Sequence, residues 1–217
     1  MLTSNLEIHW VKRFEAFLSN QGTYDSAHDP QHVRRVVENS RRLAISENAR
    51  WEIVMPAAWL HDCYHVPKSS SERSQASVLS ARLAAEFLRN ANWRESEVEG
   101  ISHAIEAHSF SARIEAKTIE AKVLQDADRL DALGAVGLAR TLMLGGEMRR
   151  SFYDQKDPFC DRRKPNDSIF TIDHLFSKLF TLESTMQTES GRLEAQHRTN
   201  YLREFIEQLK SEITDHR

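Results

Sequence analysis

The sequence is poor in the residues that break or cross-link a chain. Its 217 residues include seven glycines, five prolines and two cysteines. So few glycines and prolines favour long helices over many tight turns. The two cysteines, Cys63 and Cys160, are too few for a disulfide framework and suit a reducing compartment. We therefore expect a cytoplasmic protein that is not held together by disulfides.

Long apolar runs and a large net charge are also missing. No stretch approaches the roughly 18 apolar residues of a membrane helix, and MLTSNLEIHW lacks the basic and apolar regions of a signal peptide. The 29 basic and 32 acidic residues give a net charge of −3, which indicates no dedicated nucleic-acid surface. We expect no membrane partner, and oligomerisation stays open. Basic clusters at Arg149-Arg150 and Arg162-Arg163-Lys164 are candidate anion sites or ordinary solvated surface.

Apolar residues recur at helical spacing along most of the chain, and no stretch alternates apolar and polar residues as a strand does. Asp29 is a good N-cap, and Pro30 suits the first turn of the helix that follows it. A long loop is expected over 150–168. Further helices are expected over about 52–65, within 68–90, 98–111 and 118–134, up to Gly145-Gly146, and over about 171–187 and 189–214. The pattern predicts an all-α fold in one domain over residues 1–217.

Four polar residues lie on or beside the apolar stripes of three of these helices: His32, His61, Asp62 and Asp128. WLHDCY places His61 and Asp62 inside an apolar run, where an unpaired charge is costly. Neighbours on a helix point about 100° apart, so this pair can bind one ion from adjacent corners, with His32 and Asp128 facing it. Such a set suits a divalent metal and leaves positions open for water. Spacing alone leaves an alternative to the metal site, in which the histidines are hydrogen-bonded core residues and the aspartates cap helices.

The order His32, His61-Asp62, Asp128 resembles the HD-domain superfamily of metal-dependent phosphohydrolases. The flanking stretches HDPQHVRRV, AAWLHDCY, AIEAHSFSA and KVLQDADRLDALGAVGLAR strengthen the likeness. The chain is similar to the small single-domain bacterial branch, through DPF (157–159), DH (173–174) and TMQT (185–188) to the final helix. The resemblance implies an HD-type helical bundle with the four residues as ligands of a metal in a central cleft. A metal-binding core would cover about 28–135, with the C-terminal helices of about 170–214 packed on it.

The activity that this resemblance implies is hydrolysis of a phosphoester or phosphoanhydride bond in a nucleotide or other small phosphorylated molecule. One or two divalent ions (Mn, Mg, Co, Ni, Fe or Zn) would be held per chain. Two narrower assignments within the superfamily are weakened. One group of HD nucleotidases has a glutamate three residues after the His-Asp pair, where this chain has His65. The alarmone hydrolases carry a Glu-Asp pair shortly after the His-Asp pair, where this chain reads CYHVPK, without an acid. A nucleotide-binding sensor without turnover is the alternative, whereas a purely structural role leaves the inward acids unexplained.

Two acids are candidates for proton transfer. Asp62 could accept a proton from water or bridge a second metal. Asp131, three residues after Asp128, could activate water or orient a ligand, or it could be an ion-pair partner of Arg129 or Lys122. Cys63 follows the His-Asp pair, but we expect a buried thiol there and no nucleophile.

Candidates for substrate binding carry a positive charge or an imidazole. Lys68, Arg73 and Arg129 could each hold a phosphate as a cation, and a solvated surface charge is the alternative. His103 and His108 could contact phosphate or bind a second metal, or they could be ordinary polar residues at a helix end.

Three further residues have two interpretations each. His28 lies one helical turn before His32 and is a supporting residue or a local cap. Trp59 and Phe110 could stack on a base, but isolated aromatic residues in such positions are more often part of the core.

Overall fold

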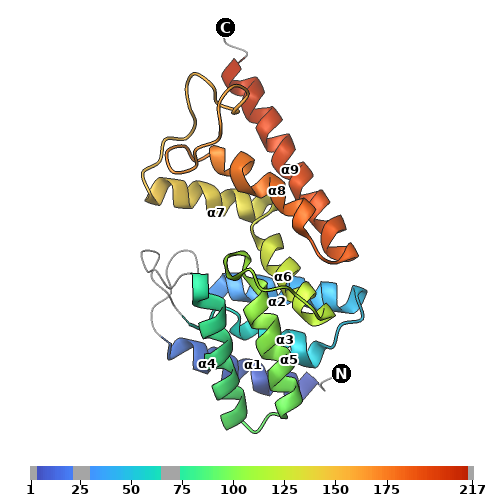
Figure 1. The fold of residues 1–217 in the computed structure, drawn as a ribbon. Coiled ribbons are helices and arrows are strands. Elements are labelled where there is room, and N and C mark those ends of the chain that lie inside the picture. Colours follow the sequence, from blue (N-terminus) through green and yellow to red (C-terminus); the bar gives the residue numbers. More distant parts are fainter. Residues whose placement is uncertain (1–3, 22–29, 65–73, 215–217) are drawn as a thin grey trace. The chain divides into compact units, whose positions relative to one another are not determined.

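The computed structural model describes residues 4–21, 30–64 and 74–214. The chain forms two compact units, residues 1–128 (unit 1) and 129–217 (unit 2), which are drawn in Figure 1. Helices dominate the described residues, in which the only β pairing is one isolated bridge between Ser151 and Phe170. The predicted all-α fold is confirmed, and the single domain over 1–217 stays a prediction. None of the described helices has the length and hydropathy to cross a membrane.

Unit 1 is built around its most apolar helix. Helix α3 (Trp51–Leu60) has every residue from Ile53 to Leu60 buried. It packs against α1 (Ser4–Ser19), α2 (Pro30–Ser46) and α5 (Glu95–His108), and α4 (Ala76–Asn90) lies along α5. A short 3-10 helix, η2 (Phe110–Ala112), follows α5. Helix α6 (Ile119–Asp131) begins in unit 1, and its last three residues belong to unit 2.

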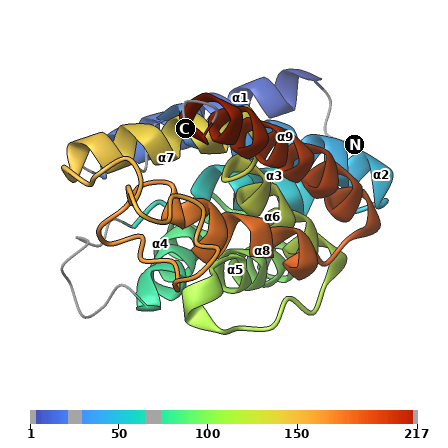
Figure 2. The same ribbon diagram turned by 90° about the horizontal axis from the view of Figure 1, so that it is seen from above.

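Unit 2 contains two long helices and one helix of mixed type. Helices α7 (Gly134–Glu147) and α9 (Glu189–Thr214) pack against each other, as Figure 2 shows. The helix expected over 171–187 is a succession of a π-helical turn, η3 (Leu175–Leu179), a short α8 (Phe180–Leu182) and a 3-10 turn, η4 (Glu183–Thr185). The predicted loop over 150–168 is confirmed apart from the isolated bridge at Ser151.

Two carboxylates hold this long loop in place. The side chain of Asp157 accepts hydrogen bonds from the backbone N–H groups of Asp161, Arg162 and Arg163. Asp173 is fully buried and forms a two-pronged ion pair with the guanidinium of Arg163. Burying a carboxylate is costly unless it is paired, so Arg163 has a structural task in unit 2.

Gly145 allows the end of α7 to approach the segment that leads into η3. A Cβ atom at this position would lie 2.3 Å from Oγ1 and 2.4 Å from Cγ2 of the buried Thr171. The next residue, Gly146, has nothing within 4 Å of the same virtual atom. Two adjacent glycines of one helix therefore differ in how much space surrounds them.

We predict opposite effects of alanine at these two positions. Gly145→Ala should lower the free energy of unfolding by about 1–3 kcal/mol, because Thr171 must move to accept the methyl group. Gly146→Ala, the matched control, should raise it by about 0.5–1 kcal/mol, because alanine is the better helix former. Urea denaturation of both variants measures the difference. Equal stability of the two would contradict the close packing of α7 on Thr171.

Candidate metal centre

Four helices of unit 1 deliver five ionisable side chains to one place. His32 comes from the first turn of α2 and Asp128 from α6. His108 is the last residue of α5. His61 and Asp62 follow α3, which ends at Leu60. The sequence pattern predicts that this helix continues to about residue 65, so its predicted end is wrong. The helix stops there because the chain tightens into a turn in which the N–H of Cys63 donates to the carbonyl of Leu60.

The ligand atoms of these side chains lie close together. Nε2 of His61 is 3.3 Å from Nε2 of His32 and 3.3 Å from Oδ2 of Asp62. Nε2 of His32 is 3.5 Å from Oδ1 of Asp128 and 3.9 Å from Oδ2 of Asp62. The other carboxylate oxygen of Asp62 lies 3.6 Å from Nε2 of His108. The structure thus brings together all four residues predicted as metal ligands, and it adds His108.

Helix ends orient two of the imidazole rings. Nδ1 of His61 is 2.8 Å from the carbonyl of Ala58, and Nδ1 of His108 is 2.7 Å from the carbonyl of Ile105. Each carbonyl belongs to the last turn of its helix, where no backbone N–H is available to it. A carbonyl oxygen can only accept, so both Nδ1 atoms carry the proton. In the neutral ring each Nε2 then has the lone pair that can bind a metal ion, the arrangement that supports a metal-binding histidine.

Two buried amides hold the backbone beside the cluster. Nδ2 of Asn39 donates to the carbonyl of Ala127, the residue before Asp128. Nε2 of Gln125 donates to the carbonyl of Ala107, the residue before His108. Neither residue is among the candidates that the sequence patterns indicate. Their signal is a buried amide within an apolar helical pattern, which costs free energy unless it is hydrogen-bonded.

The donor set fits a divalent cation. Two ligands bound at 2.0–2.1 Å to one ion are about 3.3 Å apart in a tetrahedron and about 2.9 Å apart in an octahedron. The separations within the groups His32, His61, Asp128 and His61, Asp62, His108 all lie below 4.8 Å. Imidazole nitrogen together with carboxylate oxygen suits several divalent metals, so the ligands do not select one of them.

The electrostatics of the cluster also call for positive charge. Burial opposes a charge on His61, but the carboxylates of Asp62 and Asp128 outweigh it and raise the pKa of His61 to about 9. Burial also opposes the anion of Asp62, yet His61 and His108 hold the pKa of Asp62 well below its usual range. The cluster therefore keeps the carboxylate of Asp62 ionised and favours a cation, which can be a proton or a metal ion.

The other candidates of unit 1 are used differently. His103, also on α5, accepts a hydrogen bond at Nε2 from the backbone N–H of Lys117, 3.1 Å away. This bond ties the loop after η2 to α5, and a role of His103 in substrate binding stays a prediction. Cys63 is a buried thiol that donates to the carbonyl of Ser80, and burial raises its pKa to about 12, as expected of a residue that is not a nucleophile. Lys68, Arg73 and His28 lie outside the described residues.

The two aromatic candidates differ in exposure. Trp59 lies in the core, as expected for an isolated aromatic residue of α3. The same expectation is wrong for Phe110, whose side chain is 78% exposed. It sits in η2, a 3-10 turn that begins two residues after His108 and is too short to bury it.

The remaining two candidates belong to unit 2. Asp131 is buried and forms an ion pair with Arg140 of α7. The alternative interpretation of Asp131 was an ion pair, and Arg140 is its partner here. Arg129 donates from its guanidinium to the backbone carbonyl of Thr185. Catalysis by Asp131 and phosphate binding by Arg129 stay predictions, and both side chains already have structural contacts.

Known proteins resemble this chain in sequence as well as in fold. The family model of the HD domain matches residues 31–133, which include the five residues of the cluster. YpgQ, an uncharacterised protein of Bacillus subtilis, is 32% identical over 193 residues, which are 87% of this chain and 85% of YpgQ. This chain belongs to the HD-domain family.

Solved structures place this HD protein with small bacterial relatives. A crystal structure of YpgQ is 29% identical with a TM-score of 0.74, covering 96% of this chain and 97% of that one. An HD-superfamily hydrolase from Bacillus thuringiensis is 31% identical with a TM-score of 0.70, covering 93% and 96%. A second YpgQ structure, in complex with ADP, is 29% identical with a TM-score of 0.70, covering 93% and 98%.

We predict that metal content depends on the cluster and not on α5 histidines in general. Asp128→Ala should remove most of the bound metal, because the half-buried carboxylate faces Nε2 of His32 and alanine preserves the helix. His103→Ala is the matched control and should retain it, since Nε2 of His103 is bound to the backbone of Lys117. Elemental analysis of the purified variants, with circular dichroism to check the fold, gives the answer. Equal metal content in both would argue against the site.

We predict that metal affinity rises with pH. The pKa of His61 is raised from 6.5 to about 9 in the metal-free protein, so its proton stabilises the fold fully below 6.5, and this contribution is lost as the pH rises through 9. A metal ion must displace that proton, so its dissociation constant should fall by up to about tenfold per pH unit between these values. Calorimetry in buffers of different ionisation enthalpy counts the released protons. A flat affinity over this range would contradict the coupling.

Proposed function

We propose that this HD protein is a metal-dependent phosphohydrolase that cleaves a phosphoester or phosphoanhydride bond in a nucleotide or other small phosphorylated molecule. The observation that carries the proposal is the convergence of Nε2 of His32 and His61 with carboxylate oxygens of Asp62 and Asp128. The likeness to an HD-superfamily hydrolase supports the reaction class, and the ADP complex of YpgQ supports a nucleotide as ligand.

The residues of the cluster take distinct roles in this proposal. His32, His61, Asp62 and Asp128 would hold the cation, which supplies Lewis-acid chemistry by neutralising phosphate charge and lowering the pKa of water. Nδ1 of His61 keeps its ring oriented through Ala58, so the ligand geometry is prepared before substrate arrives.

Asp62 is the proton acceptor of the cluster in this proposal. Its side chain is 24% exposed, whereas His61 beside it is fully buried, so Asp62 can meet solvent and substrate. The low pKa of Asp62 keeps the carboxylate ionised at neutral pH, and its Oδ1 lies 3.6 Å from Nε2 of His108. A proton that leaves a water molecule during attack on phosphorus can therefore pass to Asp62 and be shared with His108.

We predict that Asp62→Ala abolishes hydrolysis while the helical fold persists. The substitution removes a cluster carboxylate at a partly exposed turn position after α3. Cys63→Ala is the neighbouring control and should retain activity, because the buried thiol donates to the carbonyl of Ser80 and is not one of the cluster's ligands. The assay is a screen of nucleotides and phosphoesters with added Mn, Co, Ni, Zn or Mg, followed by kinetics on the best substrate. Near wild-type activity of Asp62→Ala would overturn the mechanism.

The same screen separates an enzyme from a sensor. A phosphohydrolase releases product in proportion to time and enzyme concentration. A sensor without turnover binds a nucleotide stoichiometrically and leaves it intact. Tight nucleotide binding with no product under any of the metals would replace the proposed enzyme by the sensor.

A further inference from the structure

Asp128, a carboxylate of the proposed metal centre, lies in the last turn of its helix. Helix α6 ends at Asp131, so residues 128–131 carry the carbonyls that have no N–H partner within the helix. The N–H of Leu133 closes a tighter turn on the carbonyl of Leu130. A last turn of this kind frays unless other groups hold it, and fraying here would displace a metal ligand.

The two sides of Asp128 are held by different parts of the chain. On its N-terminal side, Asn39 donates to the carbonyl of Ala127, and all three residues belong to unit 1. The three residues that follow Asp128 in α6 belong to unit 2, and so do their contacts with Arg198 and Arg140. These contacts act on Asp128 through the backbone of one continuous helix.

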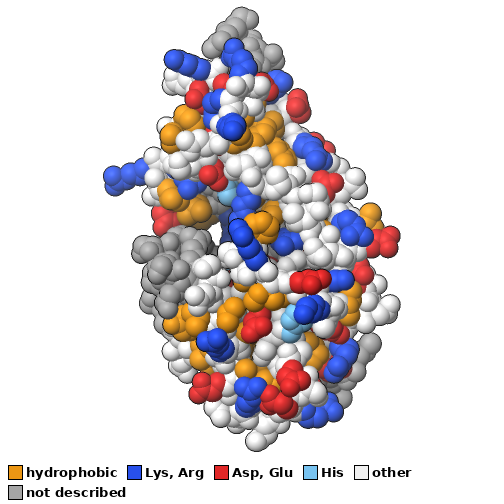
Figure 3. Space-filling view, viewed as in Figure 1, with side chains coloured by type: hydrophobic (Ala, Val, Ile, Leu, Met, Phe, Trp, Pro, Cys, Tyr) orange, Lys and Arg blue, Asp and Glu red, His pale blue; other side chains and the backbone are white. Residues whose placement is uncertain are grey.

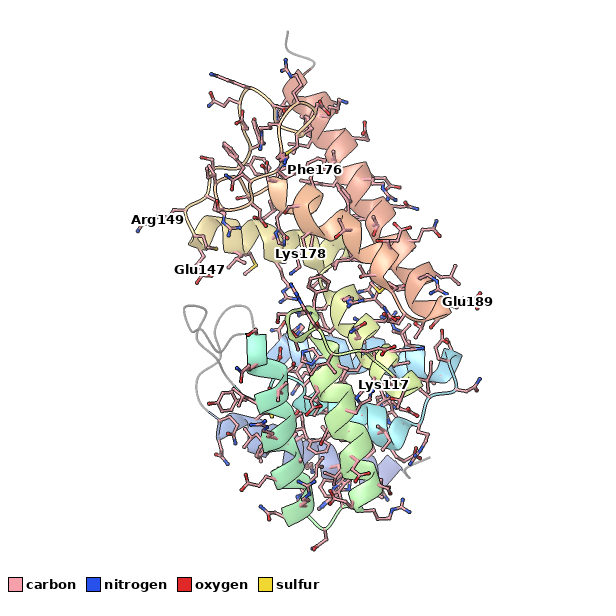
Figure 4. The ribbon with its side chains drawn as sticks, viewed as in Figure 1. Lys117, Glu147, Arg149, Phe176, Lys178 and Glu189 are labelled. Atoms are coloured by element: carbon pink, nitrogen blue, oxygen red, sulfur yellow. The ribbon has the colours of Figure 1, made fainter. Side chains whose placement is uncertain are left out.

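Arg198 of α9 caps the end of α6. Its Nη1 donates to the carbonyl of Leu130 across 2.7 Å, although the two residues are 68 positions apart. A guanidinium at a helix C-terminus gives a donor to a carbonyl that lacks a helical N–H, and its charge faces the negative pole of the helix. Helix α9 begins at Glu189, labelled in Figure 4, so Arg198 projects from the interior of a regular helix.

Two contacts fix the side chain of Arg198. Its Nε donates to Oε1 of Glu194, one turn earlier on α9, across 2.7 Å. Its stem lies against Gly134, the first residue of α7, where a Cβ atom would be 3.2 Å from Cγ of Arg198. Gly134 also has φ 68°, a left-handed conformation that favours glycine. The side chain is 18% exposed, and a bond shielded from water in this way is strengthened.

Two further arginines engage the same turn, but they are less suited to a test. Arg140 is paired with the buried carboxylate of Asp131, so its loss would leave a buried charge without this partner and endanger folding. Arg129, which donates to the carbonyl of Thr185, is itself part of the turn. Loss of the Arg198 guanidinium leaves the carbonyl of Leu130 with its bond from Leu133, so the fold should survive.

Other basic side chains lie at the surface and have no such task. Figure 3 shows Lys and Arg over much of the visible face, interspersed with Asp and Glu. Arg203, also on α9, is an exposed residue that donates to Oδ1 of Asn200 across 2.9 Å and approaches Oε2 of Glu183 at 3.4 Å. It is an arginine of the same helix whose printed partners are not in α6, which makes it a matched control for Arg198.

We propose that Arg198 is a positioning residue of the metal centre, which keeps Asp128 within reach of the cation by capping the last turn of α6. The inference rests on the proposed metal centre and adds to it a residue from unit 2. Oδ1 of Asp128 lies 3.5 Å from Nε2 of His32, and metal–ligand distances hold within about 0.2 Å. A small displacement of this turn is therefore enough to weaken binding.

Calorimetric titration of Mn or Zn into the full-length, metal-free protein tests the proposal. Arg198→Met keeps the stem of the side chain and the helix but removes the donor. It should raise the dissociation constant by about three- to tenfold, less than the roughly 10- to 100-fold typical of residues that touch a ligand directly. Arg198→Lys should recover part of the affinity, because an ammonium can still donate to the carbonyl of Leu130. Arg203→Met should bind as the wild type does, and wild-type affinity of Arg198→Met would overturn the proposal.

A second control separates positioning from general loss of stability. Gly145→Ala is expected to destabilise unit 2 through Thr171, at a place that has no printed contact with α6. Its metal affinity should equal that of the wild type. If Gly145→Ala weakens metal binding as much as Arg198→Met does, the effect is one of stability and the positioning role is wrong.

Amide hydrogen exchange of the metal-free protein examines the cap directly. Arg198→Met should speed exchange of the N–H groups of Ala132 and Leu133, which donate to the carbonyls of Arg129 and Leu130. Unchanged exchange at these two amides would show that Arg198 does not hold the turn, and would overturn the proposal. A wild type that binds no metal refutes the metal centre and this inference together. A wild type that loses metal on Asp128→Ala, but not affinity on Arg198→Met, refutes this inference alone.

Discussion

Two carboxylates and three imidazoles gathered in one place are stable only if positive charge lies among them. In unit 1 the electrostatics of the cluster favour a positive charge, because the carboxylates raise the pKa of His61 and the histidines lower the pKa of Asp62. The packing around it follows from the same need. Helix α3 ends just before His61, and α5 ends at His108. Asn39 and Gln125 hydrogen-bond to the backbone next to Asp128 and His108. A core helix as apolar as α3 can end in a His-Asp pair because the surrounding elements complete the cluster.

Much of this was visible in the sequence. Helical periodicity predicted the all-α fold, and polar residues on apolar stripes marked His32, His61, Asp62 and Asp128, because a buried charge without partners is too costly to be accidental. The end of α3 at Leu60 was not predicted, since a tight turn formed by Cys63 leaves no strong sequence signal.

Other features depend on contacts between distant residues, which periodicity does not encode. Residues 163 and 173 are ten apart, and no local rule pairs Arg163 with Asp173. The π turn at Leu175–Leu179 replaces regular helix although LFSKL has ordinary helix-forming residues. Phe110 is exposed because the chain turns at η2, whereas an apolar residue near a helix end is more often buried. In each case tertiary structure decided what propensity left open.

The termini of α3 and α5 have a consequence for the order of assembly. Both helices end at the cluster, so both present the negative pole of their peptide dipoles, each worth about 0.3–1 kcal/mol for a nearby cation and against an anion. Together with the two carboxylates, they oppose the approach of a phosphate to the cluster. On the proposed function, a cation that reverses the local field favours the approach of a phosphorylated substrate. Binding is then sequential, with the metal ion before the substrate. The cation would promote substrate binding as well as take part in the reaction.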